Sequence, residues 1–354
     1  MSRPTIRALT PEHLVDLLRD PEDRFREFGR ENRTVLRKLL GRARREVSSY
    51  VPTTWLEGAA GVLARVYGDH PYVRELEGLA RSASVGLEEL YLANIAYDIT
   101  SVAGATGLIG CTGMVHGGGD SQPPMIARNM DWVFPTGIGA HSCVFRFVDD
   151  HGSYLSVGFP GVTGVISALS SHGFALTVNQ AFHCGLPSFT SLPVPWLTRL
   201  VMDSATSYAS ARRVLATTAA ATSSYLLLAG SRPGEAARVV SHGSSDDVLA
   251  VGKDRYAVVA NHDPDEDFDV CDGEDGDSYA RHRALEKRAA GVGAGDIRAA
   301  RLALSRWPVS HASTVHQMVL VPASGELHLR CPHRGQRGYA VHKLERESHA
   351  TDGP

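Results

Sequence analysis

The spacing of apolar residues along the chain changes near residue 100. Up to that point they recur at intervals of three and four, which is the period of an amphipathic helix. Four stretches follow this pattern, namely residues 14–18, 24–47, 54–67 and 75–95. We therefore predict that residues 1–98 are helical, and that the mixed basic and acidic side chains of the second stretch form a solvated face.

Beyond residue 110 the pattern alternates with a period of two, as in half-buried strands. Polar turns at residues 149–152 and 170–173 predict two hairpins. The strands of these hairpins cover residues 141–148, 153–159, 164–169 and 174–179. Consecutive hairpins with one buried face predict an antiparallel sheet.

Helices and strands then alternate through the second half of the chain. Helices are predicted at residues 193–215 and 278–289, with Ser278 as the N-cap of the second. Further strands are predicted at residues 225–229, 237–242, 256–262, 314–321 and 326–330. Helices inserted between two runs of strands favour an α+β sandwich of sheets with helices outside.

The chain between residues 110 and 132 concentrates reactive side chains. It reads GCTGMVHGGGDSQPPMIARNMDW, which predicts two strands joined by a Gly/Pro/Asp/Ser turn. Pairing about the middle of that turn places Cys111 opposite Met130. The thiol then lies near Arg128, Asn129 and Asp131, and a guanidinium beside a thiol favours nucleophilic catalysis. Strict alternation of side chains would put Arg128 and Asp131 on opposite faces of a flat strand, so we expect a bulge or the strand end to bring them together.

A Cys-Thr pair after a small residue, followed by hydrophobic-Arg-Asn-Met-Asp-Trp, resembles the cysteine N-terminal-nucleophile (Ntn) hydrolases. The chain is most similar to the acyl-coenzyme A:6-aminopenicillanate acyltransferase family, whose relatives include acid ceramidase, N-acylethanolamine amidase and choloylglycine hydrolase. The resemblance implies a four-layer αββα fold and self-cleavage between Gly110 and Cys111. It also implies that Arg128 and Asp131 support the nucleophile. One departure is Gly113, where relatives often have Ser.

The same resemblance suggests further site residues. Asn261 ends a hydrophobic strand, and the resemblance gives it the role of oxyanion donor; the alternative is a turn residue. Asn179 or Gln180, at the end of an earlier strand, is either a second oxyanion donor or the start of a turn. A Ser-x-x-Arg pattern adds Ser278 and Arg281 as further candidates.

Cleavage before Cys111 would place a nucleophile and a base on one residue. The thiol could attack the carbonyl of Gly110, and a residue without a side chain tolerates unusual backbone angles there. The freed α-amine, with a pKa near about 8, could then act as general base. Two alternatives stay open: a non-enzymatic protein that keeps this fold as a binding module, and a papain-like protease that depends on His311 or His316.

Composition limits the classes of function. The chain has 354 residues, a formal net charge of -3, 43% hydrophobic and 21% charged residues, which is typical of a soluble protein without a nucleic-acid surface. Its five cysteines form neither a CxxC pair nor a disulfide framework. Because no signal peptide and no run of about 18 apolar residues is found, we expect a cytoplasmic protein without a membrane span.

We expect a helical pro-segment at residues 1–110 that stays associated, a catalytic domain at 111–345 and a disordered tail at 346–354. The acidic segment 263–277 has partial calcium-loop spacing, but Phe268 stands where Gly is needed, so it is interpreted as a surface loop. No metal or other cofactor is expected. The expected partners are an acyl donor, either an N-acyl amide or an acyl-CoA, and an amine acceptor, while homo-oligomerisation stays open.

Overall fold

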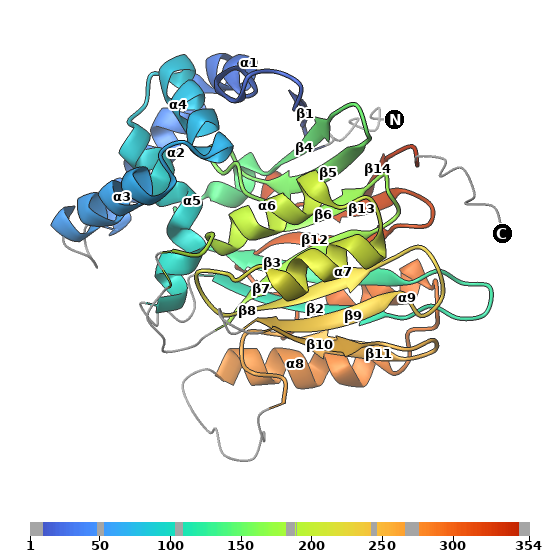
Figure 1. Cartoon of the computed structure of the whole chain (residues 1–354). Helices are drawn as coiled ribbons and strands as arrows, with labels where there is room; N and C mark the ends of the chain where they lie inside the picture. Colours follow the sequence, from blue (N-terminus) through green and yellow to red (C-terminus); the bar gives the residue numbers. More distant parts are fainter. Residues whose placement is uncertain are drawn as a thin grey trace, which may run out of the picture.

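Two packed sheets form the centre of the protein in a computed structural model. The structure describes residues 10–47, 53–102, 109–181, 188, 190–241, 246–265 and 276–346. The larger sheet has eight strands in the order β1-β4-β5-β6-β7-β8-β9-β10, and the smaller has six in the order β11-β2-β3-β12-β13-β14 (Figure 1). All neighbouring strands are antiparallel except β1 and β4, which pair in parallel.

The bounds of the strands are as follows. The larger sheet comprises β1 (Glu12–Asp16), β4 (Cys143–Val148), β5 (Ser153–Gly158), β6 (Ser167–Ser170), β7 (Ala175–Gln180), β8 (Ser224–Ala229), β9 (Ala236–Ser241) and β10 (Asp246–Ala250). The smaller sheet comprises β2 (Ile109–His116), β3 (Met125–Trp132), β11 (Tyr256–Val259), β12 (Thr314–Val321), β13 (Glu326–Arg330) and β14 (Ala340–Lys343).

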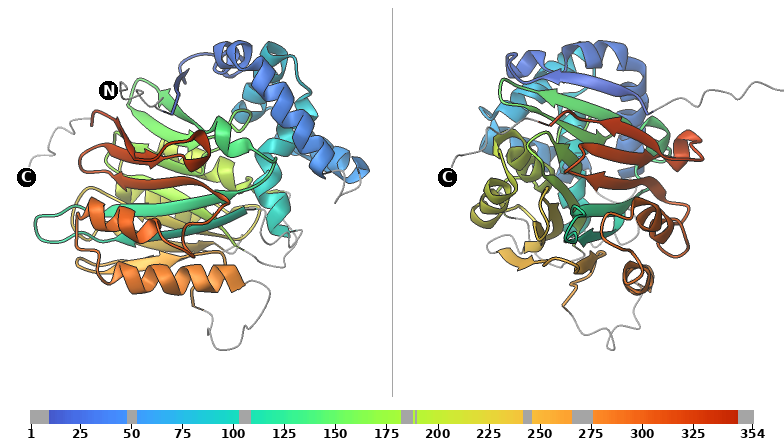
Figure 2. Two further views of the ribbon diagram at one scale, coloured as in Figure 1. Left: turned by 180° about the vertical axis from the view of Figure 1, so that it is seen from behind. Right: turned by 90° about the vertical axis from the view of Figure 1, so that its right-hand side faces the viewer.

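Helices cover the outer face of each sheet. Helices α6 (Val194–Ser204) and α7 (Tyr208–Thr217) lie on the side of the larger sheet, and α8 (Gly276–Ala289) and α9 (Ile297–Leu304) on the side of the smaller one (Figure 2). This arrangement confirms the predicted α+β fold with sheets inside and helices outside.

The remaining helices gather at one end of the sandwich (Figure 1). They are α1 (Arg26–Glu31), α2 (Arg33–Val47), α3 (Thr53–Tyr67), α4 (Pro71–Ala83) and α5 (Leu87–Val102), with the short 3₁₀ turns η1 (Pro21–Asp23), η2 (Ile138–His141) and η3 (Pro332–Arg334) elsewhere in the chain. Among the described helices, none combines the length and the apolar character needed to cross a bilayer.

Alternating side chains divide the interior into layers. Val115 and Ile126 of the smaller sheet share a hydrophobic cluster with Leu155 and Leu227 of the larger sheet, so these residues form the core between the sheets. Met114, next to Val115, belongs instead to the cluster formed with α8 and α9. Neighbouring residues of one strand therefore face different layers, as the period of two requires.

A buried ion network ties the helical end to the sandwich. Glu75 of α4 lies 3.0 Å from Arg199 of α6, and both side chains are fully buried. Arg24 contacts the same carboxylate at 2.9 Å, and Asp203 contacts Arg199 at 2.9 Å. Since a buried charge without its partner is costly, this network fixes α4 against α6.

Several predictions of elements were wrong. The stretch 14–18, predicted as helical, lies largely in strand β1, because Val15 alone points into the core while Leu14 is 66% exposed. The stretch 75–95 is two helices, since Ser84 takes a left-handed conformation with φ 53°. The stretch 193–215 is likewise two helices, and β10, α9 and β14 were not predicted.

Candidate active site

The hairpin of β2 and β3 has the predicted register. Cys111 pairs with Met130, Gly113 with Arg128, and Gly110 with Asp131. Paired residues share a face of a sheet, so Cys111 and Arg128 face the core between the sheets while Asp131 faces α8 and α9. Of the two expected causes, a bulge or the strand end, the bulge is absent because the ladder between β2 and β3 is continuous, and Asp131 lies next to Trp132, the last residue of β3. The shift of register lies instead in β12, between Thr314 and His316.

Arg128 reaches the thiol from the same face. Its Nη2 donates to Cys111 Sγ at 2.8 Å and to the carbonyl of Val178 at 2.6 Å. Nε donates to Asn179 Oδ1 at 3.2 Å, and Nη1 donates to Ser167 Oγ. Among these four hydrogen-bond partners of Arg128, only the thiol can ionise near neutral pH, while the other three are neutral oxygen atoms. A buried guanidinium in such surroundings favours the thiolate.

Burial acts on the thiol in the opposite direction. Cys111 is completely buried, and this burial raises the pKa of its thiol above the ordinary value. Arg128 lowers the pKa, and the nearby carboxylate of Asp131 raises it. Burial outweighs Arg128 in the uncleaved chain, so the thiol keeps its proton until a base removes it.

Arg281 of α8 holds the backbone of the cysteine from the other face. Its Nη1 donates to the carbonyl of Cys111 at 2.7 Å and to Thr112 Oγ1 at 2.6 Å. Its Nη2 donates to Asn261 Oδ1 at 2.9 Å. The guanidinium also lies 3.7 Å from the carboxylate of Asp131. One arginine thus links four groups around the Gly110–Cys111 junction.

Asn261 contacts the backbone nitrogen at the same junction. Its Oδ1 accepts from the N–H of Cys111 at 3.0 Å, and its Nδ2 donates to the carbonyl of Gln180 at 2.8 Å. Asn179 Nδ2 donates to the carbonyl of Ala260 at 3.1 Å. Gln180 Nε2 donates to the carbonyl of Tyr97 at 2.8 Å. In the uncleaved chain, all three candidate oxyanion amides therefore donate to backbone or hydroxyl oxygens of the protein.

Ser278 lies inside the first turn of α8 rather than at its N-cap, since the helix begins at Gly276. Its Oγ accepts from the N–H of Asn261 at 2.9 Å and lies 2.8 Å from His262 Nδ1. The other nitrogen of His262 lies 3.2 Å from His282 Nδ1. Burial lowers the pKa of His262 to about 3, so its imidazole is neutral at neutral pH. The hydrogen bond from Asn261 to Ser278 Oγ fixes the position of the asparagine backbone.

The two histidines of the papain-like alternative have other partners. His316 is fully buried, its Nε2 lies 2.8 Å from Ser142 Oγ, and its ring stacks on Phe159. Burial lowers the pKa of His316 to about 3. His311 Nε2 lies 3.1 Å from Asp131 Oδ2. The described contact of the thiol is with Arg128, so the geometry favours an arginine-supported cysteine.

Four side chains at the site were not predicted as site residues from the sequence. Thr314 donates to Asp131 Oδ1 at 2.6 Å, Thr112 accepts from Arg281, and Ser167 accepts from Arg128. Tyr97 of α5 shares a hydrophobic cluster with Cys111, and its buried hydroxyl has no hydrogen-bond partner among the described residues. Thr112 belongs to the Cys-Thr pair of the sequence motif, where it was given no role of its own, whereas Thr314, Ser167 and Tyr97 carry no local motif, so only the tertiary structure shows their proximity. Conversely, Asn129 was expected near the thiol but faces α9 and donates to the carbonyl of Leu304.

The space for a side chain at Gly113 is limited. A Cβ added there would lie 3.0 Å from Cδ1 of Leu227 in the facing sheet. A serine at this position would therefore require Leu227 to move. The glycine allows β2 to pack closely against β8.

The acidic segment and the tail are only partly described. Asp265 bonds to Arg238 at 2.6 Å, whereas Phe268 and the rest of the calcium-like spacing lie outside the described residues. Residues 347–354 of the predicted tail also lie outside them, although Arg346 donates to the carbonyl of Ala323. Within the described ranges, no group of three His, Cys, Asp or Glu side chains could hold a metal ion.

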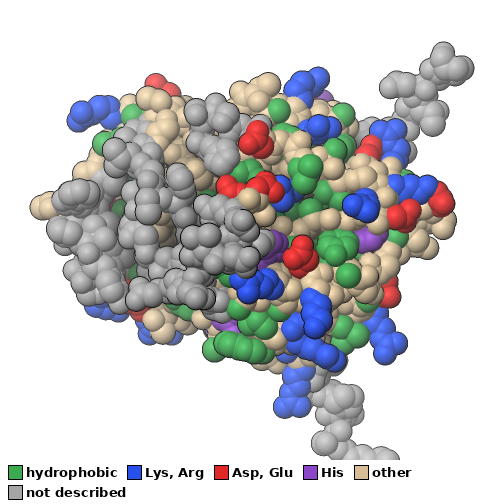
Figure 3. All heavy atoms as spheres, turned by 90° about the horizontal axis from the view of Figure 1, so that it is seen from below, with side chains coloured by type: hydrophobic (Ala, Val, Ile, Leu, Met, Phe, Trp, Pro, Cys, Tyr) green, Lys and Arg blue, Asp and Glu red, His purple; other side chains and the backbone are tan. Residues whose placement is uncertain are grey.

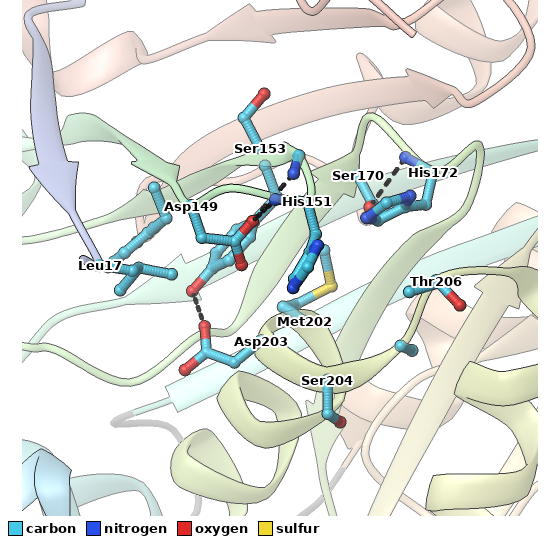
Figure 4. A pocket seen from close by; sticks show the side chains of 14 residues that line it. Leu17, Asp149, His151, Ser153, Ser170, His172, Met202, Asp203, Ser204 and Thr206 are labelled. Carbon is cyan, nitrogen blue, oxygen red and sulfur yellow. Dashed lines mark hydrogen bonds between the residues drawn. The ribbon is translucent and has the colours of Figure 1, made fainter. Parts of the chain in front are cut away.

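A small surface pocket of about 70 Å³ lies between the β4–β5 turn and the end of α6 (Figure 4). His151, His172 and Met202 are among its lining residues. Asp203 at this pocket accepts from Tyr154 at 2.5 Å and also bonds Arg199, so its oxygens are already engaged. None of the candidate site residues lines it.

The face seen from below carries both basic and acidic side chains among its described atoms (Figure 3). This mixture agrees with the small net charge of the chain. A surface of one sign, of the kind that binds nucleic acid, is not evident on the described part of this face.

Comparison with solved structures identifies the fold. A Caenorhabditis elegans N-acylethanolamine-hydrolyzing acid amidase ortholog matches with a TM-score of 0.53 and 17% sequence identity, over 66% of this chain and 100% of that one. The chain therefore has the fold of the Ntn hydrolases, as the sequence predicted.

Sequence comparisons narrow this class. Residues 117–291 match the family model described as acyl-coenzyme A:6-aminopenicillanic acid acyl-transferase. Acid ceramidase of Homo sapiens is 24% identical over 264 residues, which cover 66% of this chain and 64% of the ceramidase. Acid ceramidase of Rattus norvegicus is 24% identical over 263 residues, which also cover 66% of this chain and 64% of that protein. The chain is thus similar to the acyl-transferase family over residues 117–291, and it spans 64% of the length of these ceramidases.

Proposed function

We propose that the protein is a self-processing cysteine amidohydrolase or acyltransferase. It cleaves its own Gly110–Cys111 bond and then forms an acyl thioester on Cys111. The observation that carries this proposal is the 2.8 Å contact between Arg128 Nη2 and the sulfur, on a residue whose backbone is held by Asn261 and Arg281.

The self-cleavage step can be written with all atoms accounted for. Cys111 Sγ attacks the carbonyl carbon of Gly110, the C–S bond forms and the C–N bond breaks. The thiol proton passes to the departing nitrogen, which becomes the α-amine of Cys111. Water then opens the thioester, releasing the Gly110 carboxylate and regenerating the thiol.

The catalytic cycle uses the same atoms. The α-amine accepts the thiol proton and delivers it to the leaving amine of the substrate. Arg128 stabilises the sulfur as it loses its proton, which matters because burial raises the pKa of the Cys111 thiol. Asp131 and Asn261 hold the amine from either side. Resolution of the thioester by water gives hydrolysis, and resolution by an amine gives acyl transfer.

The substrate class follows from the names of the relatives. The structural neighbour is named for hydrolysis of N-acylethanolamines, two sequence relatives are ceramidases, and the matching family is named for transfer from an acyl-coenzyme A. We propose an N-acyl amide as the acyl donor, with acyl-CoA and a small amine as the donor and acceptor of the transfer reaction. Parallel incubations with an N-acylethanolamine, a ceramide and an acyl-CoA, each with and without an amine acceptor, separate these reactions.

Intact-mass measurement of the purified protein tests the proposal. We expect two fragments that meet between residues 110 and 111, and inactivation by iodoacetamide. Cys111→Ala should remain one uncleaved chain. Cys143→Ala is the matched control, because Cys143 is equally buried on a neighbouring sheet yet should leave cleavage unchanged.

The alternative is a non-enzymatic protein that keeps the fold as a binding module. It predicts an intact parental chain whose Cys111 is not alkylated and whose mass does not differ from that expected for residues 1–354. The papain-like alternative predicts instead that His311→Ala or His316→Ala abolishes activity in a chain that is not cleaved before Cys111. Either result would replace the proposal.

A further inference from the structure

The carboxylate of Asp131 lies between the cleavage junction and a histidine near the surface. Asp131 Oδ2 is 3.4 Å from the point where a Cβ on Gly110 would lie, so this oxygen is next to the junction. The same oxygen is 3.1 Å from His311 Nε2. Oδ1 accepts from Thr314 at 2.6 Å, which fixes the plane of the carboxylate.

His311 is held in a definite position by its own turn. Its backbone N–H donates to Thr314 Oγ1 at 3.1 Å, and the backbone N–H of Thr314 donates to the carbonyl of His311 at 3.0 Å. Thr314 therefore orders the histidine and the aspartate at once. The imidazole and the ring of Trp307, which is 71% exposed, lie nearly perpendicular to each other with centroids 6.4 Å apart.

The two partners differ in their access to water. The side chain of Asp131 is 3% exposed, whereas that of His311 is 14% exposed. The imidazole therefore has more access to solvent than the carboxylate with which it is paired. A histidine is suited to this position because its charge changes near neutral pH.

We propose that His311 is a positioning residue that orients the carboxylate of Asp131 and exchanges protons between that carboxylate and water. This inference rests on the proposed function, since it concerns the protonation of the Cys111 amine. The balance is simple: a proton leaves the ammonium of Cys111 for Asp131, passes to His311 Nε2, and one proton leaves His311 Nδ1 for water. No bond between heavy atoms changes in this exchange.

The charges around His311 come from several elements. Asp131 of β3 faces its Nε2, and Arg281 of α8 lies 3.7 Å from the same carboxylate. Arg288 of α8 donates to the carbonyls of Arg306 and Trp307 in the neighbouring loop, and His333 of η3 lies 2.8 Å from the carbonyl of Ala312. These last groups are engaged with backbone oxygens, so we assign the exchange to the His311–Asp131 pair.

Two substitutions separate orientation from proton exchange. His311→Gln keeps an N–H that can reach Asp131 but does not titrate near neutral pH, and His311→Ala removes both properties. The assay is the rate of Cys111 alkylation by iodoacetamide as a function of pH, measured with the fraction of chain cleaved at residue 110. His151→Gln is the control, because His151 is exposed on a turn remote from Cys111.

We expect the alkylation rate of the parental protein to show an inflection with pH that depends on the imidazole of His311. His311→Gln should lose this inflection while keeping its rate on the plateau, and His311→Ala should be slower by about tenfold or more at every pH, because the carboxylate is misplaced. His151→Gln should match the parental protein.

Two results would overturn the inference, and they are distinguishable. If Cys111 is cleaved and alkylated in all variants with the parental pH profile, His311 has no such role and the proposed function stands. If the parental chain is uncleaved and Cys111 does not react, the proposed function fails and takes the inference with it.

Discussion

Asp98 offers a test of how the helical end is joined to the sandwich. This residue of α5 is 6% exposed, and its Oδ1 accepts from the N–H of Val194 at 3.1 Å and from Thr222 at 2.8 Å. Its Oδ2 is buried without a hydrogen-bond partner among the described residues. We consider the substitution Asp98→Asn, which keeps the accepting oxygen and removes the ionisable group.

The magnitude follows from the protonation of this carboxyl. Burial raises the pKa of Asp98 from the ordinary 3.8 to about 7. The folded state therefore disfavours the carboxylate, and the cost of ionisation appears above pH 3.8, grows until about pH 7 and is constant beyond it. At about 1.4 kcal/mol per pKa unit, the full cost is about 4 kcal/mol, of which about 3 kcal/mol develops between pH 5 and pH 8.

Urea unfolding of the Cys111→Ala background measures this difference, since the proposed function predicts that this variant stays in one piece. We expect the stability of Asp98→Asn relative to its background to increase by about 3 kcal/mol from pH 5 to pH 8. The exposed Asp150→Asn serves as control and should show no comparable trend. A difference that is independent of pH, or one that falls as pH rises, would refute the reasoning.

Two further substitutions test the site and the ion network. Arg128→Lys keeps the charge but not the set of directed bonds, so cleavage before Cys111 should slow by about 100-fold, as a time course of fragment formation would show; an unchanged rate would contradict the role of the guanidinium. Glu75→Gln leaves the buried Arg199 short of a partner and should cost about 3 to 5 kcal/mol in unfolding free energy, whereas Glu22→Gln in an exposed pair should cost under about 1 kcal/mol; equal losses would contradict the role of burial.

The hairpin around the cysteine was predictable because its signals are local. The turn residues and the alternating strands lie within one short stretch, and they were sufficient to place Cys111 opposite Met130. The faces of Arg128 and Asp131 followed from the same alternation. The expected bulge is absent from this hairpin: Arg128 lies on the face of the sulfur, to which it donates, and Asp131 lies on the face of α8 and α9.

Features that depend on remote pairing were not predictable. Strand β1 is ordered by β4, more than a hundred residues later, and its five residues read equally well as the start of a helix. The contacts of Asp131 with Thr314 and His311 join residues about 180 positions apart. Such contacts depend on the order of strands in the sheet, in which β12 lies beside β3, and no local pattern encodes that order.

The central claim is that Cys111 becomes the N-terminal nucleophile of the processed protein. Rapid acid quenching during turnover of an N-acyl amide, followed by proteolysis and mass spectrometry, tests it most directly. The account predicts a peptide that begins at Cys111 and carries the acyl group on sulfur, released by hydroxylamine. An unmodified peptide that still spans Gly110 and Cys111, or an acyl group attached to another residue, would contradict it.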